Sequence, residues 1–405
     1  MRELNELVAD VLPDVVSLRR DLHAHPEVAF AEHRTADRVA AELQKIKGLS
    51  IRRDLAETAV VALLNESKTG PCVALRADMD ALPIQEETDL AYASTHPGTM
   101  HACCHDGHTS CLVGTARVLA AIADALPGQV KFIFQPAEED GAGADVLCRA
   151  GVLESPRVDA VFALHACPDQ QLGRIAVGTG PVHAATNPFE VTVRGRGTHG
   201  GYPHQGIDPI VAACAIVTAL QTIVSRTADP IDTAVVTVGQ IHAGNAINII
   251  PDTCKLAGTI RTFDPGLRST VVQRVREIAD HVAKAHGAAA EVDVIDGYPV
   301  AVNDRACADL VARVGREVLG SRNVFTRLRR SMGGEDFAYY AQKVPAAVFR
   351  LGIRPPGADE VPNLHSARID FNDDALPVGI TLLSRIAQTF LENAARSDKP
   401  GAPPM

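Results

Sequence analysis

The sequence predicts an α/β fold with a mostly parallel sheet, interrupted by a smaller α+β domain. Three short segments, 72–75, 130–134 and 160–164, are apolar apart from Lys131. Strands without a polar face are typical of a parallel sheet that is covered on both sides. Helical patterns lie between these segments, and this alternation indicates an α/β domain. We find no internal repeats.

The larger domain is expected to surround an insertion. Its helix at 108–126 follows the first strand, with Asp106 as the candidate N-cap. After the insertion we expect a helix at 304–318, a strand at 347–351 and a helix at 374–392, which would complete the same domain. The tail 397–405 is rich in Pro and polar residues and is expected to be disordered.

The insertion has the order β-α-β-β-α-β, the pattern of a ferredoxin-like sheet. Asp208-Pro209 and Asp264-Pro265 each place an N-cap residue before a proline and predict helices that run to about 226 and 286. We therefore expect a lid or dimerisation domain at 187–296, between the two parts of the larger domain at 1–186 and 297–405. The strands of this insertion are expected at 189–193, 233–241, 254–262 and 290–295.

Composition limits the function classes. The chain has 39 Lys and Arg against 49 Asp and Glu, a net charge of −10. This balance argues against nucleic-acid and anionic membrane partners. No stretch reaches about 18 uninterrupted apolar residues, and the acidic N-terminus does not resemble a secretory signal. Nine cysteines are an odd number without a disulfide pattern, so a reducing cytoplasm is expected.

The densest candidate site is MHACCHDGH at 100–108, which holds three His, two Cys and one Asp. Thiolate, imidazole and carboxylate are the side-chain ligands of zinc-like ions. A helix start with incidental histidines would explain the same residues.

Polar residues also follow the three apolar strands. Asp78 and Asp80 follow the first, Glu138 and Glu139 follow the second, and His165 follows the third. In an open α/β sheet, ligands bind beyond the carboxyl ends of the strands. Adjacent carboxylates in an extended segment point to opposite sides, so one can ligate a metal while the other faces the substrate. A solvated acidic loop is the alternative.

The whole set of motifs resembles the M20 metallopeptidase family, most closely its amidohydrolase branch of hippurate hydrolases, auxin–amino acid conjugate hydrolases and N-acyl-amino acid aminoacylases. The resemblance spans nearly the whole chain in the family's order. The motifs that carry it are LRRDLH with Pro26-Glu27, RADMDALP at 76–83, MHACCHDGH, QPAEED at 135–140, His165, THGGYPH with Asp208-Pro209, NIIP at 248–251, GTIRTF at 258–263, SMGGEDFAYY at 331–340 and NLHS at 363–366.

The resemblance implies a role for ten residues. Glu138 matches the general base, Asp80 the acid that orients the metal site, and His199 the lid histidine that reaches the partner subunit's active site. Asn248 and Arg261 match lid residues at the carboxylate end of the substrate. The metal ligands it implies are Cys103 as the bridge, His105, Glu139, His165 and His365. Cys104 replaces the family's usual glycine, which leaves the choice between the two adjacent cysteines open.

The implied function is hydrolysis of N-acyl (acetyl, benzoyl or larger) amino acids to a carboxylic acid and a free amino acid. A metal-bridging hydroxide attacks the amide while Glu138 acts as the general base. Two divalent ions per subunit are implied, Zn²⁺ first, with Mn²⁺, Co²⁺ or Ni²⁺ as alternatives. The implied assembly is a homodimer or homotetramer formed through the lid domain. The competing hypotheses are a di- or tripeptidase of the same family, a hydrolase with a Cys103 or Cys104 nucleophile, and a metal-stabilised binding protein without activity.

Overall fold

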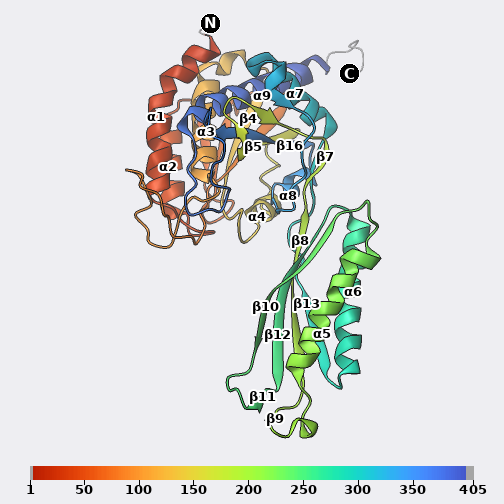
Figure 1. Ribbon diagram of the computed structural model, residues 1–405. Coiled ribbons are helices and arrows are strands. Elements are labelled where there is room, and N and C mark those ends of the chain that lie inside the picture. Colours follow the sequence, from red (N-terminus) through yellow and green to blue (C-terminus); the bar gives the residue numbers. More distant parts are fainter. Residues whose placement is uncertain (1–2, 398–405) are drawn as a thin grey trace. The chain divides into compact units, whose positions relative to one another are not determined.

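A computed structural model describes residues 3–397 as two compact units (Figure 1). The first unit takes the described residues up to Gly180, Val302–Arg329, and those from Asp336 onward. The second takes Pro181–Ala301 and Arg330–Glu335. The sequence-based limits of the insertion, 187–296, lie inside this second unit. Most of the tail expected to be disordered lies outside the described residues.

The first unit is built on an eight-stranded sheet with the order β1-β2-β4-β3-β5-β16-β6-β15. Its central strands run parallel, which confirms the predicted fold class. They are β3 (Cys72–Asp78), β4 (Gln129–Gln135), β5 (Ala160–Gln171) and β16 (Ala346–Arg354). The outer strands are β1 (Leu49–Arg52), β2 (Val60–Leu64), β6 (Ile175–Ala176) and β15 (Val324–Phe325).

Helices cover this sheet because β3 and β4 are buried along their whole length and leave no face for water. The buried cluster beneath them joins residues from both ends of the chain. The helices are α1 (Leu4–Ala24), α2 (His33–Gln44), α3 (His105–Ala121), α4 (Gly143–Arg149), α7 (Arg305–Leu319), α8 (Ala338–Ala341) and α9 (Leu376–Ser397), with short helical turns η1 (Ala123–Ala125), η4 (Ser321–Asn323) and η5 (Asp373–Ala375).

The start of α3 differs from the prediction. The helix begins at His105, and its N-cap is Cys104, which has a left-handed φ of 66°. The expectation that Asp106 caps the helix is therefore wrong. Asp106 lies inside the first turn, where its carboxylate bonds the buried side chains of His23 and Arg19.

The second unit is an antiparallel sheet of order β10-β12-β8-β13 with two helices on one face (Figure 1). The predicted N-caps of both helices are confirmed. Asp208 accepts from the N–H groups of Ile210 and Val211, and Asp264 accepts from that of Leu267. The elements follow the order β8 (Ala185–Arg194), β9 (Thr198–His199), η2 (Pro203–Gln205), α5 (Pro209–Thr222), η3 (Ile223–Thr227), β10 (Ala234–Ala243), β11 (Ile249–Ile250), β12 (Thr253–Thr262), α6 (Pro265–Ala285) and β13 (Ala289–Val294); β7 (Gly180–His183) and β14 (Ala301–Asn303) lie at the junctions.

One helical stretch in the described residues, Pro209–Thr227, is long and apolar enough for a membrane span by length and composition alone. One face of it belongs to the core of the second unit, through Ala212, Ala213, Ile216 and Leu220. Its other face exposes Val211 and Val224. A core helix passes the same test, so this stretch is weak evidence for a membrane.

Candidate metal centre

The predicted metal ligands gather at one edge of the first unit's sheet. Glu139 follows β4, His165 lies on the parallel strand β5, and His105 opens α3. Ligand atoms of Cys103, His105 and His165 lie within 4.8 Å of one another. The same holds for Cys103, Glu139 and His365. Cys103 belongs to both groups. The fold therefore brings all five predicted ligands together, and the Cys103 thiol is the ligand that the two groups share.

Hydrogen bonds orient two of the imidazoles toward the centre. Nδ1 of His105 lies 2.9 Å from the main-chain oxygen of Asp80, and Nδ1 of His165 lies 2.8 Å from that of Ala166. A carbonyl only accepts, so each Nδ1 carries a proton, and this bond directs each Nε2 toward the centre. Nε2 of His165 lies 3.7 Å from Sγ of Cys103. Both rings therefore present the nitrogen that a metal requires.

The electrostatics of the cluster fit a bound cation. Nε2 of His105 is buried and makes no hydrogen bond within residues 3–397, and Oε1 of Glu139 lies 3.1 Å from Nε2 of His365. Burial raises the pKa of Cys103 well above its ordinary value, and the charges of Glu139 and Glu138 raise it further. A divalent ion would stabilise the thiolate and give Nε2 of His105 a partner. The residues present thus suit a metal.

The same pKa shift argues against a cysteine nucleophile. A nucleophilic cysteine needs a lowered pKa and a positive environment, whereas Cys103 lies beside two carboxylates. Cys104 is completely buried in the apolar core, and burial raises the pKa of its thiol as well. Only Cys103 belongs to the ligand groups of the described chain. This geometry favours Cys103 over Cys104 as the ligand.

Asp80 connects two of the candidate ligands. Its main-chain oxygen faces His105, and its Oδ2 accepts from the N–H of Glu139 at 2.9 Å. Glu138 is 5% exposed, and a carboxylate oxygen of it lies within 4.8 Å of ligand atoms of His105 and Glu139. Its Oε1 is 3.4 Å from the N–H of Asp336. The candidate base therefore lies beside the ligands and is itself held by the chain.

The sequence motifs do not predict a buried hydrogen-bond network that surrounds Arg76. Arg76 donates hydrogen bonds to Gln135, Asp78 and Asp336. All four residues are at most 1% exposed. Asp78 bonds Nδ1 of His108 at 2.6 Å. Asp78 and His108 each lie in a motif that indicated the candidate site, but nothing in the sequence predicts the hydrogen bond between them. Asp336 lies in the SMGGEDFAYY motif, but nothing in the sequence places it beside Arg76.

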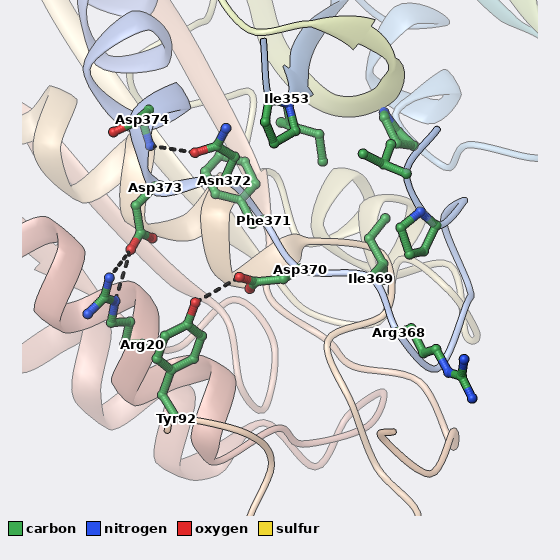
Figure 2. A pocket seen from close by; sticks show the side chains of 14 residues that line it. Arg20, Tyr92, Ile353, Arg368, Ile369, Asp370, Phe371, Asn372, Asp373 and Asp374 are labelled. Carbon is green, nitrogen blue, oxygen red and sulfur yellow. Dashed lines mark hydrogen bonds and ion pairs between the residues drawn. The ribbon is translucent and has the colours of Figure 1, made fainter. Parts of the chain in front are cut away.

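A second buried cluster ties α1 to the segment that carries His365. Arg19 is fully buried and contacts the carboxylates of Asp106, Asp370 and Asp373. Figure 2 shows the outer side of this cluster, where Arg20 pairs with Asp373 and Tyr92 donates to Asp370. This side forms a cavity of about 430 Å³. Residues on both sides of His365 in sequence line it, namely Val361, Pro362, Arg368 and Ile369.

The remaining predicted residues belong to the second unit. The N–H of Gly200 donates to the main-chain oxygen of Asn248 at 2.7 Å, so Asn248 lies beside His199 on β9. Nδ1 of His199 accepts from the N–H of Gly201 at 2.9 Å, which leaves Nε2 as the protonated nitrogen. Arg261 lies at the other end of β12 and donates to Thr259. His199 and Asn248 are thus neighbours, and Arg261 is apart from them.

Comparison with known sequences identifies the family. The sequence model described as Peptidase family M20/M25/M40 matches residues 74–389. The chain belongs to this family. N-acetylcysteine deacetylase of Bacillus subtilis (strain 168) is 38% identical over 382 residues, which cover 93% of this chain and 97% of that protein. IAA-amino acid hydrolase ILR1-like 4 of Arabidopsis thaliana is 37% identical, over 93% of this chain and 86% of that protein.

Solved structures of M20 proteins share the fold. The YXEP protein of Bacillus subtilis, described as a dinuclear metal binding peptidase from the M20 family, has a TM-score of 0.81 and 34% identity. The match covers 95% of this chain and 99% of that one. A tripeptidase from Staphylococcus aureus has a TM-score of 0.73 at 18% identity, over 94% of this chain and 99% of that one, and shows the likeness of fold alone.

His23 gives a prediction about pH. Burial opposes its charged form, but its bonds to Asp106 and Glu86 outweigh this cost and raise its pKa to about 10, from 6.5. A raised pKa adds stability that is complete below pH 6.5 and is lost as the pH passes 10. We expect His23→Gln to destabilise the metal-free protein by about 1–3 kcal/mol below pH 6.5. The difference should shrink toward pH 10.

Urea unfolding of both proteins between pH 6 and 10 measures this difference. His25→Gln is the matched control, because it removes a histidine of the same helix end that lacks a buried ion pair in the described chain and contacts Asp21 and the ring of His96. A difference between wild type and His23→Gln that stays constant or grows with pH would contradict the assigned ion pairs.

Proposed function

We propose that the chain is a metal-dependent amidohydrolase that cleaves N-acyl amino acids to a carboxylic acid and a free amino acid. The observation that carries this proposal is the placement of Glu138 beside two ligand groups that share Cys103. The relatives named as an N-acetylcysteine deacetylase and an IAA-amino acid hydrolase support hydrolysis of an amide to an amino acid. Membership in the M20 family supports metal dependence.

Two divalent ions are proposed for the centre. Five ligands exceed the four of a closed structural zinc site, and a shared thiolate allows two ions with open positions. Cys103, His105 and His165 would hold one ion, and Cys103, Glu139 and His365 the other. The nitrogen and sulfur ligands favour Zn²⁺, with Mn²⁺, Co²⁺ or Ni²⁺ as alternatives. When bound, such ions polarise the amide and lower the pKa of water toward neutrality.

The residues of the chain would handle the proton and the substrate. Glu138 accepts a proton from the attacking water and passes it to the leaving amine. Its nearly complete burial favours this role, since a dry site strengthens the electrostatic interactions in the transition state. Asp80 keeps His105 and Glu139 in place through the two bonds described above.

The second unit is proposed to bind the substrate and a partner subunit. Burial lowers the pKa of Arg261, and its guanidinium has no ion pair within residues 3–397, so it suits the free carboxylate of an amino acid. His199 would stabilise the reacting amide in the partner's site, and Asn248 would contact the carboxylate end of the substrate. The apolar outer face of α5 and the unpaired edge of β10 support a homodimer or homotetramer through this lid. The small-molecule substrate and the acidic net charge are consistent with a cytoplasmic protein without nucleic-acid or membrane partners.

A substrate panel tests the proposed activity. Protein reconstituted with Zn²⁺ or Mn²⁺ is assayed for amine release from N-acetyl, N-benzoyl and longer N-acyl amino acids, and from di- and tripeptides. We expect turnover of acyl amino acids, loss of turnover with a chelator, and recovery with added metal. Activity confined to the peptides would favour the peptidase alternative, and activity that survives chelation would contradict the metal centre.

Glu138→Ala separates base catalysis from metal binding. Removal of a positioned general base costs about 10²–10⁴-fold in rate, and Glu138 is assigned no place among the five ligands. We therefore expect unchanged metal content by elemental analysis and a loss of kcat in that range. Glu139→Ala is the comparison, because it should lose metal as well. Undiminished turnover by Glu138→Ala would contradict the mechanism.

Mixed dimers test a role for His199 across subunits. His199→Ala and Glu138→Ala are each expected to be nearly inactive. When the two variants are mixed, a hybrid dimer would contain one site with both an intact Glu138 and an intact His199, so part of the activity should return. No recovery, with subunit exchange verified by mass spectrometry, would argue against the proposed role in trans.

A further inference from the structure

We propose that Glu32 is a positioning residue for catalysis, which holds the backbone beside Glu138 so that this base faces the metal centre. The inference rests on the proposed function of Glu138. Glu32 precedes α2 and is far from the ligands in sequence. It acts through the main chain of Ala137, and we assign it no contact with substrate or metal.

The contacts of Glu32 reach the loop that carries the base. Its Oε1 accepts from the N–H of Ala137 at 2.8 Å, and its Oε2 accepts from the hydroxyl of Thr58 at 2.7 Å. Glu32 is completely buried. Burial raises its pKa, and the charge of Asp80 raises it further. A buried carboxyl group with both oxygens bonded is a fixed support for the peptide group that it contacts.

That peptide group needs support. Ala137 has a φ of 55°, in the left-handed region that non-glycine residues seldom adopt. Such a conformation costs about 1–3 kcal/mol and persists only where the surroundings enforce it. The N–H of Gly143 donates a hydrogen bond to the carbonyl oxygen of Ala137 at 2.9 Å. Glu32 accepts a hydrogen bond from the N–H of Ala137. The two bonds together fix the direction in which the chain enters Glu138.

Two carboxyl groups thus hold the backbone on both sides of the base. Glu32 binds the N–H of Ala137, and Asp80 binds the N–H of Glu139. Asp80 fixes the backbone of Glu139, the candidate ligand that follows Glu138. Glu32 fixes the backbone of Ala137, the residue before Glu138. The sequence motif predicted only the first of these supports.

Helix capping does not account for Glu32. It occupies the N-cap position of α2, yet its side chain makes no capping hydrogen bond there. The first N–H groups of α2 are instead bonded by Glu27, which accepts from Arg34 and Thr35. The Glu32 carboxyl group is therefore committed to Ala137 and Thr58.

The test compares Glu32→Ala with Glu32→Gln. Alanine removes the acceptor for Ala137, so Glu138 loses its fixed direction while the metal ligands stay in place. A misplacement of about 1 Å can cost roughly 10²-fold in rate, and we expect kcat to fall about 10- to 100-fold. KM should change less than about threefold, because substrate contacts are untouched. Glutamine keeps the acceptor oxygen and can donate its amide to Thr58, so kcat should recover to within about fivefold of the wild type.

Two further variants serve as controls. Thr58→Val removes the bond to Oε2 alone and should give a smaller loss of kcat than Glu32→Ala. Glu42→Ala removes another buried glutamate of the same region, one that pairs with Arg38, Lys45 and Arg117. It should lower thermal stability without lowering kcat, which separates a general loss of stability from mispositioning. Elemental analysis measures metal content in every variant.

Hydrogen exchange gives a readout that does not depend on activity. In metal-free protein, the amides of segment 135–142 should exchange faster in Glu32→Ala than in wild type, Glu32→Gln or Glu42→Ala. Unchanged exchange in Glu32→Ala would overturn the proposal. So would a Glu32→Gln variant as impaired in kcat as Glu32→Ala, or a loss of kcat matched by a loss of metal.

The outcomes distinguish this inference from the proposed function. If wild-type protein released no amine from any acyl amino acid or peptide, the proposed function would fail. The exchange of segment 135–142 would still decide whether Glu32 holds Ala137. If Glu32→Ala did not fold, Glu32→Gln and Thr58→Val would decide through their order in kcat and exchange.

Discussion

The burial of many ionisable groups at one sheet edge is the constraint on which the rest of the first unit depends. Asp78, Asp80, Glu138 and Glu139 are at most slightly exposed, and the thiol of Cys103 lies among them. Burying carboxylates is costly unless each finds a partner. Arg76 neutralises Asp78 and His108 hydrogen-bonds it, whereas Cys103 and Glu139 face only the imidazoles of His105, His165 and His365 among the basic side chains that the structure describes. Divalent ions would supply the missing positive charge.

The fold meets this constraint with regular strands and buried hydrogen bonds that hold the ionisable groups in place. The parallel strands β3, β4 and β5 deliver the motifs to one edge, and Arg76 ties β3 to β4 and to Asp336. The loop after β4 then departs from regular structure. Gly143 is required there, because a Cβ atom would lie 1.8 Å from the oxygen of Pro136. Support from Glu32 and Asp80 lets an irregular loop present Glu138 in one direction.

The sequence predicted those features that arise from local patterns. Apolar strands followed by acids indicated the candidate site, and Asp-Pro pairs predicted the starts of both helices of the second unit. The helices α1 and α2 received no prediction, although Leu7, Val8, Val15, Leu18 and Leu22 share one buried face of α1. Asp106 was misjudged as a cap because its partners, His23 and Arg19, come from a distant helix. The contact of Glu32 with Ala137 and that of Asp336 with Arg76 escaped notice for the same reason, since only the folded chain creates them.

Anomalous diffraction from crystals of metal-loaded protein tests the central claim most directly. Two anomalous peaks are expected at the edge of the sheet, with Sγ of Cys103 in contact with both. One ion would bind His105 and His165, and the other Glu139 and His365, while Glu138 would bind neither. A single peak, a pair of peaks without Cys103 between them, or ions held by Asp78 and His108 would contradict it.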